Sequence, residues 1–289
     1  MSPVIPEPDE LTRELEDAMH AKATAPWDRM ILQTLGGGAF IALGFVFMVT
    51  TQQGMDEWPI GLAQLIGGTV FSVGLGLVVI SGSDLFAGTT MTLVPRLSGR
   101  ISTGRMVGHW GISAAGNLIG AVLIALLLLF AGTHATNDSA WGLIVLDITQ
   151  AKLGHDWHQA FFLGILANLA VCLAVWIATA GRSVTDKVLG VIGPIALFVA
   201  AGFEHSVANM FMLPMGLLIK NFAGDPFWQG EAMKAAGATA ADYSSITLGA
   251  TLWDNLVPVV LGNIVGGAVL VGAYFWAIHR RGDSDPATS

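Results

Sequence analysis

One apolar run constrains this fold more than any other feature of the sequence. Residues 188–219 contain no charged side chain except Glu204 and no imidazole except His205. The run is much longer than the roughly 20 residues that one helix needs to cross a bilayer. Ionisable groups at membrane depth are costly, and they usually face a cavity or a transport path. The run therefore predicts a membrane helix that breaks at its polar centre.

The composition agrees with a lipid environment. Hydrophobic residues make up 53% of the chain and charged residues only 12%, with a mean hydropathy of +0.65, whereas soluble domains carry about 25% charged residues. The net charge of -8 argues against a nucleic-acid partner, which requires a basic face. Cys172 is the single cysteine, so an internal disulfide is impossible.

No pattern in the sequence indicates an enzyme, a metal or a cofactor. Glu204 and His205 lack a second histidine at the spacing of a zinc-binding His-Glu-x-x-His helix. The serines lack the Gly-x-Ser-x-Gly turn that presents a nucleophile. We therefore expect no catalytic residues, no metal site and no cofactor.

Hydropathy indicates six apolar regions in an all-α membrane protein. They cover residues 30–50, 62–80, 109–131, 159–180, 188–219 and 255–278, with polar linkers at 132–156 and 220–250. The expected organisation is an acidic N-terminal segment (1–28), a six-helix transmembrane domain (29–281) and a short C-terminal tail (282–289). The N-terminal segment is expected to be a solvated or interfacial helix, because its charged residues are mostly acidic.

The distribution of Lys and Arg predicts that both termini are cytoplasmic. Cytoplasmic loops carry the excess of these residues. Only Lys152, Lys220 and Lys234 fall on the opposite side. The cytoplasmic side is expected to hold the others: Arg13, Lys22, Arg29, Arg96, Arg100, Arg105, Arg182, Lys187, Arg280 and Arg281.

The two halves of the chain look related. The run 62–94 has Asp84 as its only charge, as 188–219 has Glu204, and each acid follows a glycine by two positions. Each run is followed by a nearly identical pattern, Gly116-Asn117-Leu118-Ile119-Gly120 and Gly262-Asn263-Ile264-Val265-Gly266. Three spans per half with both termini on one side imply opposite topology, which is the inverted-repeat plan of transport proteins. Close packing through small residues is the competing explanation for the Gly-Asn patterns.

Several longer motifs resemble one protein family. They are Leu85-Phe86, Gly99-Arg100-Ile101, Leu163-Gly164-Ile165-Leu166-Ala167-Asn168-Leu169, Gly181-Arg182-Ser183, Asp186-Lys187 and Phe203-Glu204-His205-Ser206-Val207-Ala208-Asn209-Met210-Phe211-Met212. In these motifs the chain is similar to the formate/nitrite transporter family, most closely to its formate channels.

The resemblance implies a homopentamer in the bacterial inner membrane, with one substrate pore through each protomer. It also implies an aquaporin-like protomer whose second helix is broken by a loop at about 81–92 and whose fifth is broken at about 202–206. The substrate expected from the resemblance is formate or a similar small monovalent anion. Nitrite and hydrosulfide remain alternatives within the family, and a neutral-solute or ammonium channel is a more distant one.

The resemblance also assigns roles to residues of the pore. His205 corresponds to the central histidine, with Glu204 and Asn168 as its companions. Phe71 and Phe198 resemble the outer constriction; Leu75, Leu85 and Phe86 resemble the inner one; Lys152 resembles the basic residue of the outer vestibule. One position departs from the family, because Ala87 stands where the formate channels usually have a threonine. Thr89 and Thr90 are the nearby hydroxyls that are candidates to replace it.

Each of these residues also has a structural interpretation. His205 could be a core histidine bonded to Glu204 or Asn168, and Asp84 and Glu204 could cap the amides of broken helices. Asn117 and Asn263 are expected to bind backbone rather than substrate. Lys152 could belong to a solvated loop with His155 and His158, and His109 is expected at the interface beside Trp110.

The energetics favour passage as a neutral acid. A bare carboxylate in a dry constriction costs on the order of 20 kcal/mol in the Born limit. Protonating a carboxylate whose pKa is about 4 costs only about 4 kcal/mol at neutral pH. We therefore expect a small weak acid to cross the apolar rings neutral or charge-compensated, with His205 as the titratable group between them, giving proton-coupled transport.

Overall fold

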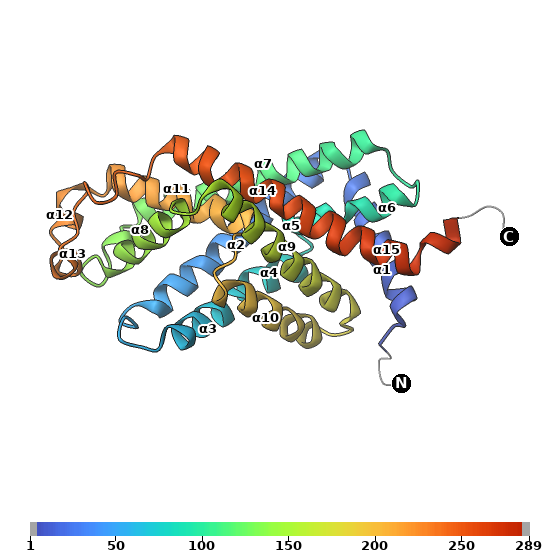
Figure 1. Ribbon diagram of the computed structural model, residues 1–289, viewed down its shortest axis with the longest axis horizontal. Helices are drawn as coiled ribbons and strands as arrows, with labels where there is room; N and C mark the ends of the chain where they lie inside the picture. The colour runs from blue at the N-terminus through green and yellow to red at the C-terminus, as the bar shows by residue number, and fades with distance from the viewer. Residues whose placement is uncertain (1–4, 285–289) are drawn as a thin grey trace.

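The computed structural model describes residues 5–284 as an all-helical protein (Figure 1). No strand occurs in that range. The first half contains α1 (Pro8–Thr24), α2 (Trp27–Gln52), α3 (Ile60–Phe71), α4 (Val73–Ser81), α5 (Phe86–Thr89), η1 (Thr90–Thr92), α6 (Leu93–Leu97), α7 (Thr103–Phe130) and η2 (Thr133–Ala135). The second half contains α8 (Ala140–Leu153), α9 (Trp157–Ala180), α10 (Val184–Ala200), α11 (Ser206–Phe222), α12 (Gly224–Trp228), α13 (Glu231–Ala236), η3 (Ala250–Leu256), α14 (Val257–Ile264), η4 (Val265–Ala273), α15 (Tyr274–His279) and η5 (Arg281–Ser284). The last five residues of the tail expected at 282–289 lie outside the described residues.

Five helical segments are long and apolar enough to cross a membrane. They are Trp27–Gln52, Ile60–Ser81, Thr103–Phe130, Trp157–Ala180 and Ala250–His279. The last is one continuous helix with π-helical turns at Ala250–Leu256 and Val265–Ala273. The outward faces are apolar: on α7, for example, Leu127 and Phe130 are 64% and 82% exposed. Such faces suit lipid or a neighbouring apolar surface, in agreement with the expected all-α membrane protein.

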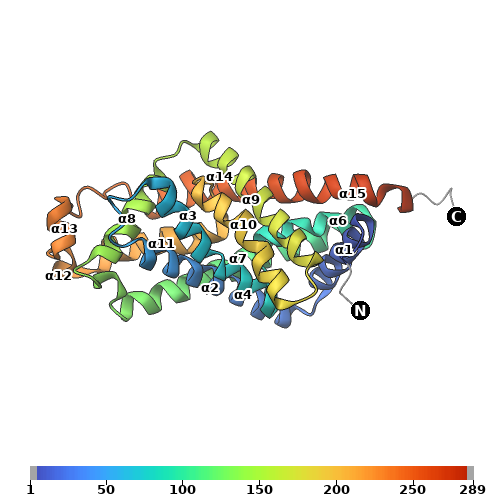
Figure 2. The same cartoon turned by 90° about the horizontal axis from the view of Figure 1, so that it is seen from below.

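The two ends of the molecule carry different short helices. Helices α1, α6 and α15 lie at one end, and α8, α12 and α13 lie at the other (Figures 1 and 2). Helix α8 lies within the linker 132–156, which the sequence predicted only as polar. We call these the α1 end and the α8 end.

Helical structure is interrupted at two corresponding places. Helix α4 ends at Ser81 and α5 begins at Phe86, while α10 ends at Ala200 and α11 begins at Ser206. Gly82 and Gly202 end the preceding helices with φ of 73° and 69°, a left-handed conformation that glycine adopts without a steric penalty. The first interruption is shorter than the expected loop at about 81–92, because residues 86–97 already form short helices.

Two asparagine side chains bridge these interruptions. Asn117 Oδ1 accepts the amide of Phe86 at 2.7 Å, and its Nδ2 donates to the carbonyls of Thr34 and Asp84. Asn263 Oδ1 accepts the amide of Ser206 at 2.9 Å, and its Nδ2 donates to the carbonyls of Gly164 and Glu204. Each carboxamide therefore pairs backbone groups that a broken helix would leave unsatisfied in an apolar environment.

The glycines beside these asparagines allow two helix pairs to approach closely. A Cβ on Gly120 would lie 2.1 Å from the carbonyl oxygen of Leu35, and a Cβ on Gly266 would lie 2.2 Å from that of Ile165. The repeated Gly-Asn patterns are therefore consistent with both explanations from the sequence. Their glycines allow close packing, and their asparagines occupy matching positions in the two halves.

Helix α1 was expected to be solvated or interfacial, and one of its faces packs against the rest of the protein. Leu15 and Met19 are buried. Glu16 is also buried, and its carboxylate pairs with Arg100 at 3.3 Å and with Arg280 at 2.8 Å. Hydrophobic residues at helical spacing form this buried face between the acidic residues, so α1 is not fully solvated; whether it is interfacial stays a prediction.

Replacing Asn117 or Asn263 with leucine should destabilise the protein strongly. The substitution keeps the approximate shape but leaves buried amide and carbonyl groups unpaired, at about 1–3 kcal/mol for each group. Thermal unfolding of the purified protein measures the effect. Asn221→Leu is the matched control, because Asn221 is exposed and bonds only within its own helix. Equal melting temperatures for all three variants would contradict the bridging role.

Candidate functional site

A cavity of about 260 Å³ opens toward the α8 end. His205 and Glu204 form part of its wall, and Lys152 and His155 line it from α8 and the residues that follow. Its apolar wall includes Phe45, Phe71 and Phe198. The structure therefore brings Phe71, Phe198, Lys152, Glu204 and His205 to one cavity, which we call the outer cavity.

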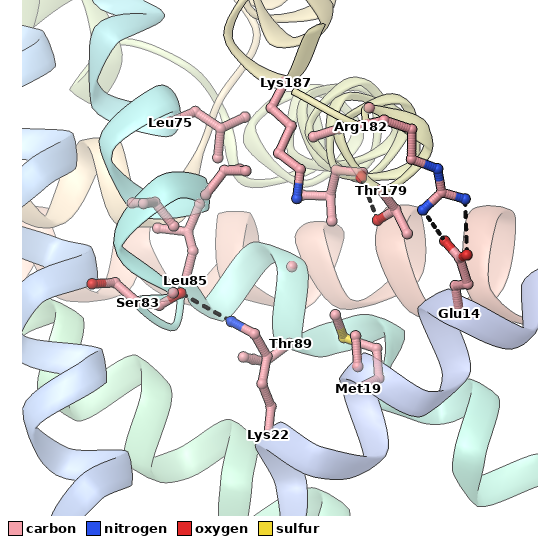
Figure 3. A pocket seen from close by; sticks show the side chains of 18 residues that line it. Glu14, Met19, Lys22, Leu75, Ser83, Leu85, Thr89, Thr179, Arg182 and Lys187 are labelled. Carbon is pink, nitrogen blue, oxygen red and sulfur yellow. Dashed lines mark hydrogen bonds and ion pairs between the residues drawn. The ribbon is translucent and has the colours of Figure 1, made fainter. Parts of the chain in front are cut away.

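A second cavity, of about 320 Å³, lies toward the α1 end. Leu75, Leu85 and Thr89 line it (Figure 3). Four charged side chains also line it: Glu14, Lys22, Arg182 and Lys187. We call this the inner cavity. Phe71 in the outer wall and Leu75 in the inner wall follow each other closely in sequence, so the cavities approach each other at a short apolar segment.

Aromatic rings crowd the outer side of that segment. The ring centroids of Phe71 and Phe198 are 5.6 Å apart in an edge-to-face arrangement, and Phe198 lies 5.6 Å from the ring of His205. Phe45 packs against Phe71 at 5.1 Å. All four rings are at least 95% buried. An ion passing this point would therefore lose most of its water.

His205 presents one ring nitrogen without a partner. It precedes α11, and its Nδ1 accepts the backbone amide of Ala208 at 3.2 Å. Because Nδ1 accepts, the hydrogen of a neutral ring is on Nε2. Nε2 is buried and has no hydrogen-bond partner among the described residues. His205 is therefore bonded to neither Glu204 nor Asn168, and it has a free donor at the outer cavity.

Glu204 is held by a buried set of donors. Its carboxylate accepts from Lys152 Nζ at 2.8 Å, from Asn209 Nδ2 at 2.6 Å and from Asn255 Nδ2 at 3.0 Å. His155 Nε2 lies 3.8 Å away. The expectation that Glu204 caps a broken helix is wrong, because Asn263 makes that contact. Lys152 is an ion-pair partner and belongs to no solvated loop, since α8 carries its side chain inward with only 14% exposed.

Asp84 has a corresponding set of partners at the inner break. Lys22 Nζ bonds its carboxylate, and His109 Nε2 lies 3.1 Å from it. Asp84 is likewise no helix cap, because Asn117 fills that role. His109 was expected at the interface, but it is fully buried, where its ring bonds the carboxylate of Asp84.

The two sets of partners occupy corresponding positions in the two halves. Lys22 and Lys152 stand at the same spacing before Gln33 and Leu163, whose carbonyls accept the amides of Asp84 and Glu204. His109 and Asn255 stand at the same spacing before Asn117 and Asn263. Aligning the halves beyond the Gly-Asn patterns would have identified Lys22, His109 and Asn255, which the sequence analysis missed.

Four of the expected pore residues line neither cavity: Asn168, Ala87, Thr90 and Phe86. Asn168 Nδ2 donates to the carbonyls of Asn263 and Ala87 and to the hydroxyl of Thr90. Thr90 in turn donates to the carbonyl of Ala87 at 2.6 Å. These contacts anchor α5 to α9 and α14. Thr89 does line the inner cavity, although its hydroxyl donates to the carbonyl of Phe86 at 2.9 Å. Phe86 is buried in the core and lines neither cavity.

Comparisons with known proteins agree along most of the chain. A family model described as "Formate/nitrite transporter" matches residues 9–277. The formate channel FocA of Escherichia coli (strain K12) is 43% identical over 274 residues, covering 95% of this chain and 94% of that protein. A probable formate transporter of Methanothermobacter thermautotrophicus is 36% identical over 277 residues, covering 90% of this chain and 92% of that protein.

Solved structures give the same result. A structure described as a pentameric formate channel with formate bound superposes with a TM-score of 0.81 at 41% identity, covering 87% of this chain and 96% of that one. An FNT family ion channel superposes with a TM-score of 0.74 at 29% identity, covering 94% and 98%. The chain belongs to the formate/nitrite transporter family.

Proposed function

We propose that this protein is a membrane channel for formate and similar small monovalent anions, with proton coupling through His205. Relatives that match nearly the whole chain are named as formate channels, and one solved relative is described as a pentamer with formate bound. The protein accordingly assembles as a homopentamer in the lipid bilayer of a bacterial inner membrane, with one path through each protomer.

Each protomer has six spans arranged as an inverted repeat. The interrupted α3–α6 and α10–α11 segments are its second and fifth spans. Support comes from the corresponding contacts of Lys22 with Asp84 and of Lys152 with Glu204, and from the matching bridges of Asn117 and Asn263. Helices α1 and α15 lie at the same end (Figure 2), as an even number of spans requires. The excess of Lys and Arg at that end supports its position in the cytoplasm.

The observation that carries the proposal is the unpartnered Nε2 of His205, in the wall of the outer cavity. A buried hydrogen-bond donor without a partner is costly. A carboxylate arriving from the outer cavity can accept this hydrogen bond and compensate that cost. Glu204 lies beside His205 but is already neutralised by Lys152, so its charge does not exclude the anion.

His205 also provides a route for a proton. A proton first adds to Nδ1, which gives up its bond to the Ala208 amide. The resulting imidazolium gives its Nε2 hydrogen to the anion and is left as a neutral ring. The anion becomes a neutral acid, for which the apolar segment beyond is a far smaller barrier. Phe71 and Phe198 form the outer side of this segment, and Leu75 and Leu85 form the inner side. Phe86 supports the inner side from the core. Asn168, Thr90 and the Ala87 carbonyl hold the scaffold behind it.

Formate is favoured over the other candidate substrates by the named relatives. Nitrite and hydrosulfide have the same charge and also form weak acids, so they are competitors for the same path. An ammonium channel would gain from aromatic capture of a cation. Aromatic rings do line the outer cavity, but Lys152 and the hydrogen-bond donor of His205 share its wall and favour an anion.

The proposed function is tested by formate uptake into proteoliposomes at several pH values. For the wild type, uptake above that of protein-free liposomes should rise as the external pH falls. His205→Asn should lose this rise, because asparagine can still accept the Ala208 amide at a helix start but cannot exchange a proton. Size-exclusion chromatography checks that the variant remains a pentamer. A His205→Asn variant with the wild-type pH profile would refute coupling through His205, and wild-type liposomes that carry methylammonium but no formate would refute the anion channel.

Lys152 and Glu204 should depend on each other. Lys152→Gln and Glu204→Gln each leave a buried charge without its partner, so each should lower the melting temperature substantially. The double variant removes both charges and should lose much less than the sum of the single losses, with a coupling of about 1–3 kcal/mol. The matched control is the exposed pair Glu231 and Lys234, at 2.9 Å, whose exchange to glutamine should show no measurable coupling. Additive losses at Lys152 and Glu204 would contradict the buried pair.

A further inference from the structure

The two cavities differ in their balance of charge. In the outer cavity the carboxylate of Glu204 offsets the ammonium group of Lys152. In the inner cavity three cationic side chains, Lys22, Arg182 and Lys187, share the wall with one carboxylate, that of Glu14. The inner cavity therefore has an excess of positive charge, although the chain as a whole carries a net charge of -8.

Two of the three inner cations already have partners. Lys22 bonds the carboxylate of Asp84 and the carbonyl of Ser83. Arg182 forms two hydrogen bonds to the carboxylate of Glu14, at 2.8 and 3.1 Å (Figure 3). The hydrogen bond to Glu14 raises the pKa of Arg182 above its usual value. Both side chains are thus committed to holding α1 in place.

Lys187 is different, because its ammonium group forms no ion pair or hydrogen bond with any residue in the range 5–284. It extends from α10 into the space between Leu75 and Thr179 (Figure 3). The carboxylate of its neighbour Asp186 is directed away from this space, because it accepts the amides of Arg182 and Ser183 at 3.1 and 3.0 Å.

Its position makes a bound anion favourable. Lys187 lies in the first turn of α10, where the positive end of the helix dipole disfavours a cation. Its stem passes close to the backbone at Gly181, where an added Cβ would lie 2.9 Å from Lys187 Cγ. The side chain therefore passes over Gly181 and enters the cavity. A bound anion there would offset the repulsion between the ammonium group and the helix dipole.

We propose that Lys187 is a substrate-binding residue of the inner cavity, which captures formate or another small monovalent carboxylate before it enters the constriction at Leu75 and Leu85. This inference rests on the proposed function. The ion is held by one ammonium group in a cavity open to water, so binding is weak and sensitive to salt. The half-saturating formate concentration is consequently lower at the α1 face than it would be without this lysine.

The test measures formate flux separately from each face, in right-side-out and inside-out membrane vesicles at low ionic strength. For Lys187→Met, the half-saturating formate concentration at the α1 face should rise about two- to fivefold, the size expected for one partly screened charge. At the α8 face it should stay unchanged. The difference from wild type should shrink when a non-transported salt is added at a concentration that shortens the Debye length to about 3 Å.

Two further variants make the result decisive. Lys187→Arg keeps the charge and should retain the wild-type half-saturating formate concentration at the α1 face. If the methionine variant does not assemble, this variant still tests the need for a positive charge. Lys234→Met removes a lysine near the α8 end, on α13, and should leave the α1-face value unchanged. No change at the α1 face in Lys187→Met, or equal changes at both faces, would overturn the proposal. Wild-type vesicles that carry no formate from either face would instead refute the proposed function.

Discussion

Backbone groups exposed at membrane depth are the constraint on which this structure depends. Each interruption of a membrane helix frees amides and carbonyls that have no water to bond. Asn117 and Asn263 meet this requirement from neighbouring helices, and each joins three separate segments through one carboxamide. The bridging side chains come from α7 and α14, so each interruption is bonded to a neighbouring helix. Asn263 bonds the backbone of Glu204 and of Ser206, on either side of His205 in the wall of the outer cavity.

A buried carboxylate lies beside each of these breaks, and each carboxylate is paired with a lysine. Asp84 and Glu204 each lie next to a break, and a lysine and a neutral or titratable side chain bond each carboxylate. The two arrangements differ in two ways. His109 stands where Asn255 stands in the other half, and Asn209 gives Glu204 a further donor, whereas Thr89 at the corresponding position bonds the carbonyl of Phe86. Pairing leaves each site close to neutral, so an anion meets no net repulsion from these acids. The uncompensated charge lies further out, on Lys187 in the inner cavity.

Much of this organisation was predictable from the sequence, for reasons that differ between residues. Glu204 is the only charged residue in the long apolar run 188–219, and this predicted a polar break in the helix. The repeated Gly-Asn patterns predicted helices at matching positions in the two halves. The family resemblance, which the comparisons confirm, grouped Phe71, Phe198 and His205, and the structure places them at one cavity. Composition could not show that α1 is packed, because Leu15 and Met19 are hidden among acidic residues. The sequence analysis named Lys152 as a vestibule residue but did not predict the partners of Asp84 and Glu204. Lys22, Lys152 and Asn255 are far from these acids in sequence and meet them only in the folded chain.

The central claim is that a small carboxylate binds at Nε2 of His205. Solid-state NMR of the pentamer in lipid, with ¹⁵N-labelled histidine and ¹³C-labelled formate, measures this contact directly. The account predicts that His205 has its hydrogen on Nε2 and an unprotonated Nδ1, and that formate carbon shows a dipolar coupling to Nε2 that disappears in His205→Asn. A hydrogen on Nδ1, or bound formate with no coupling to His205, would contradict it.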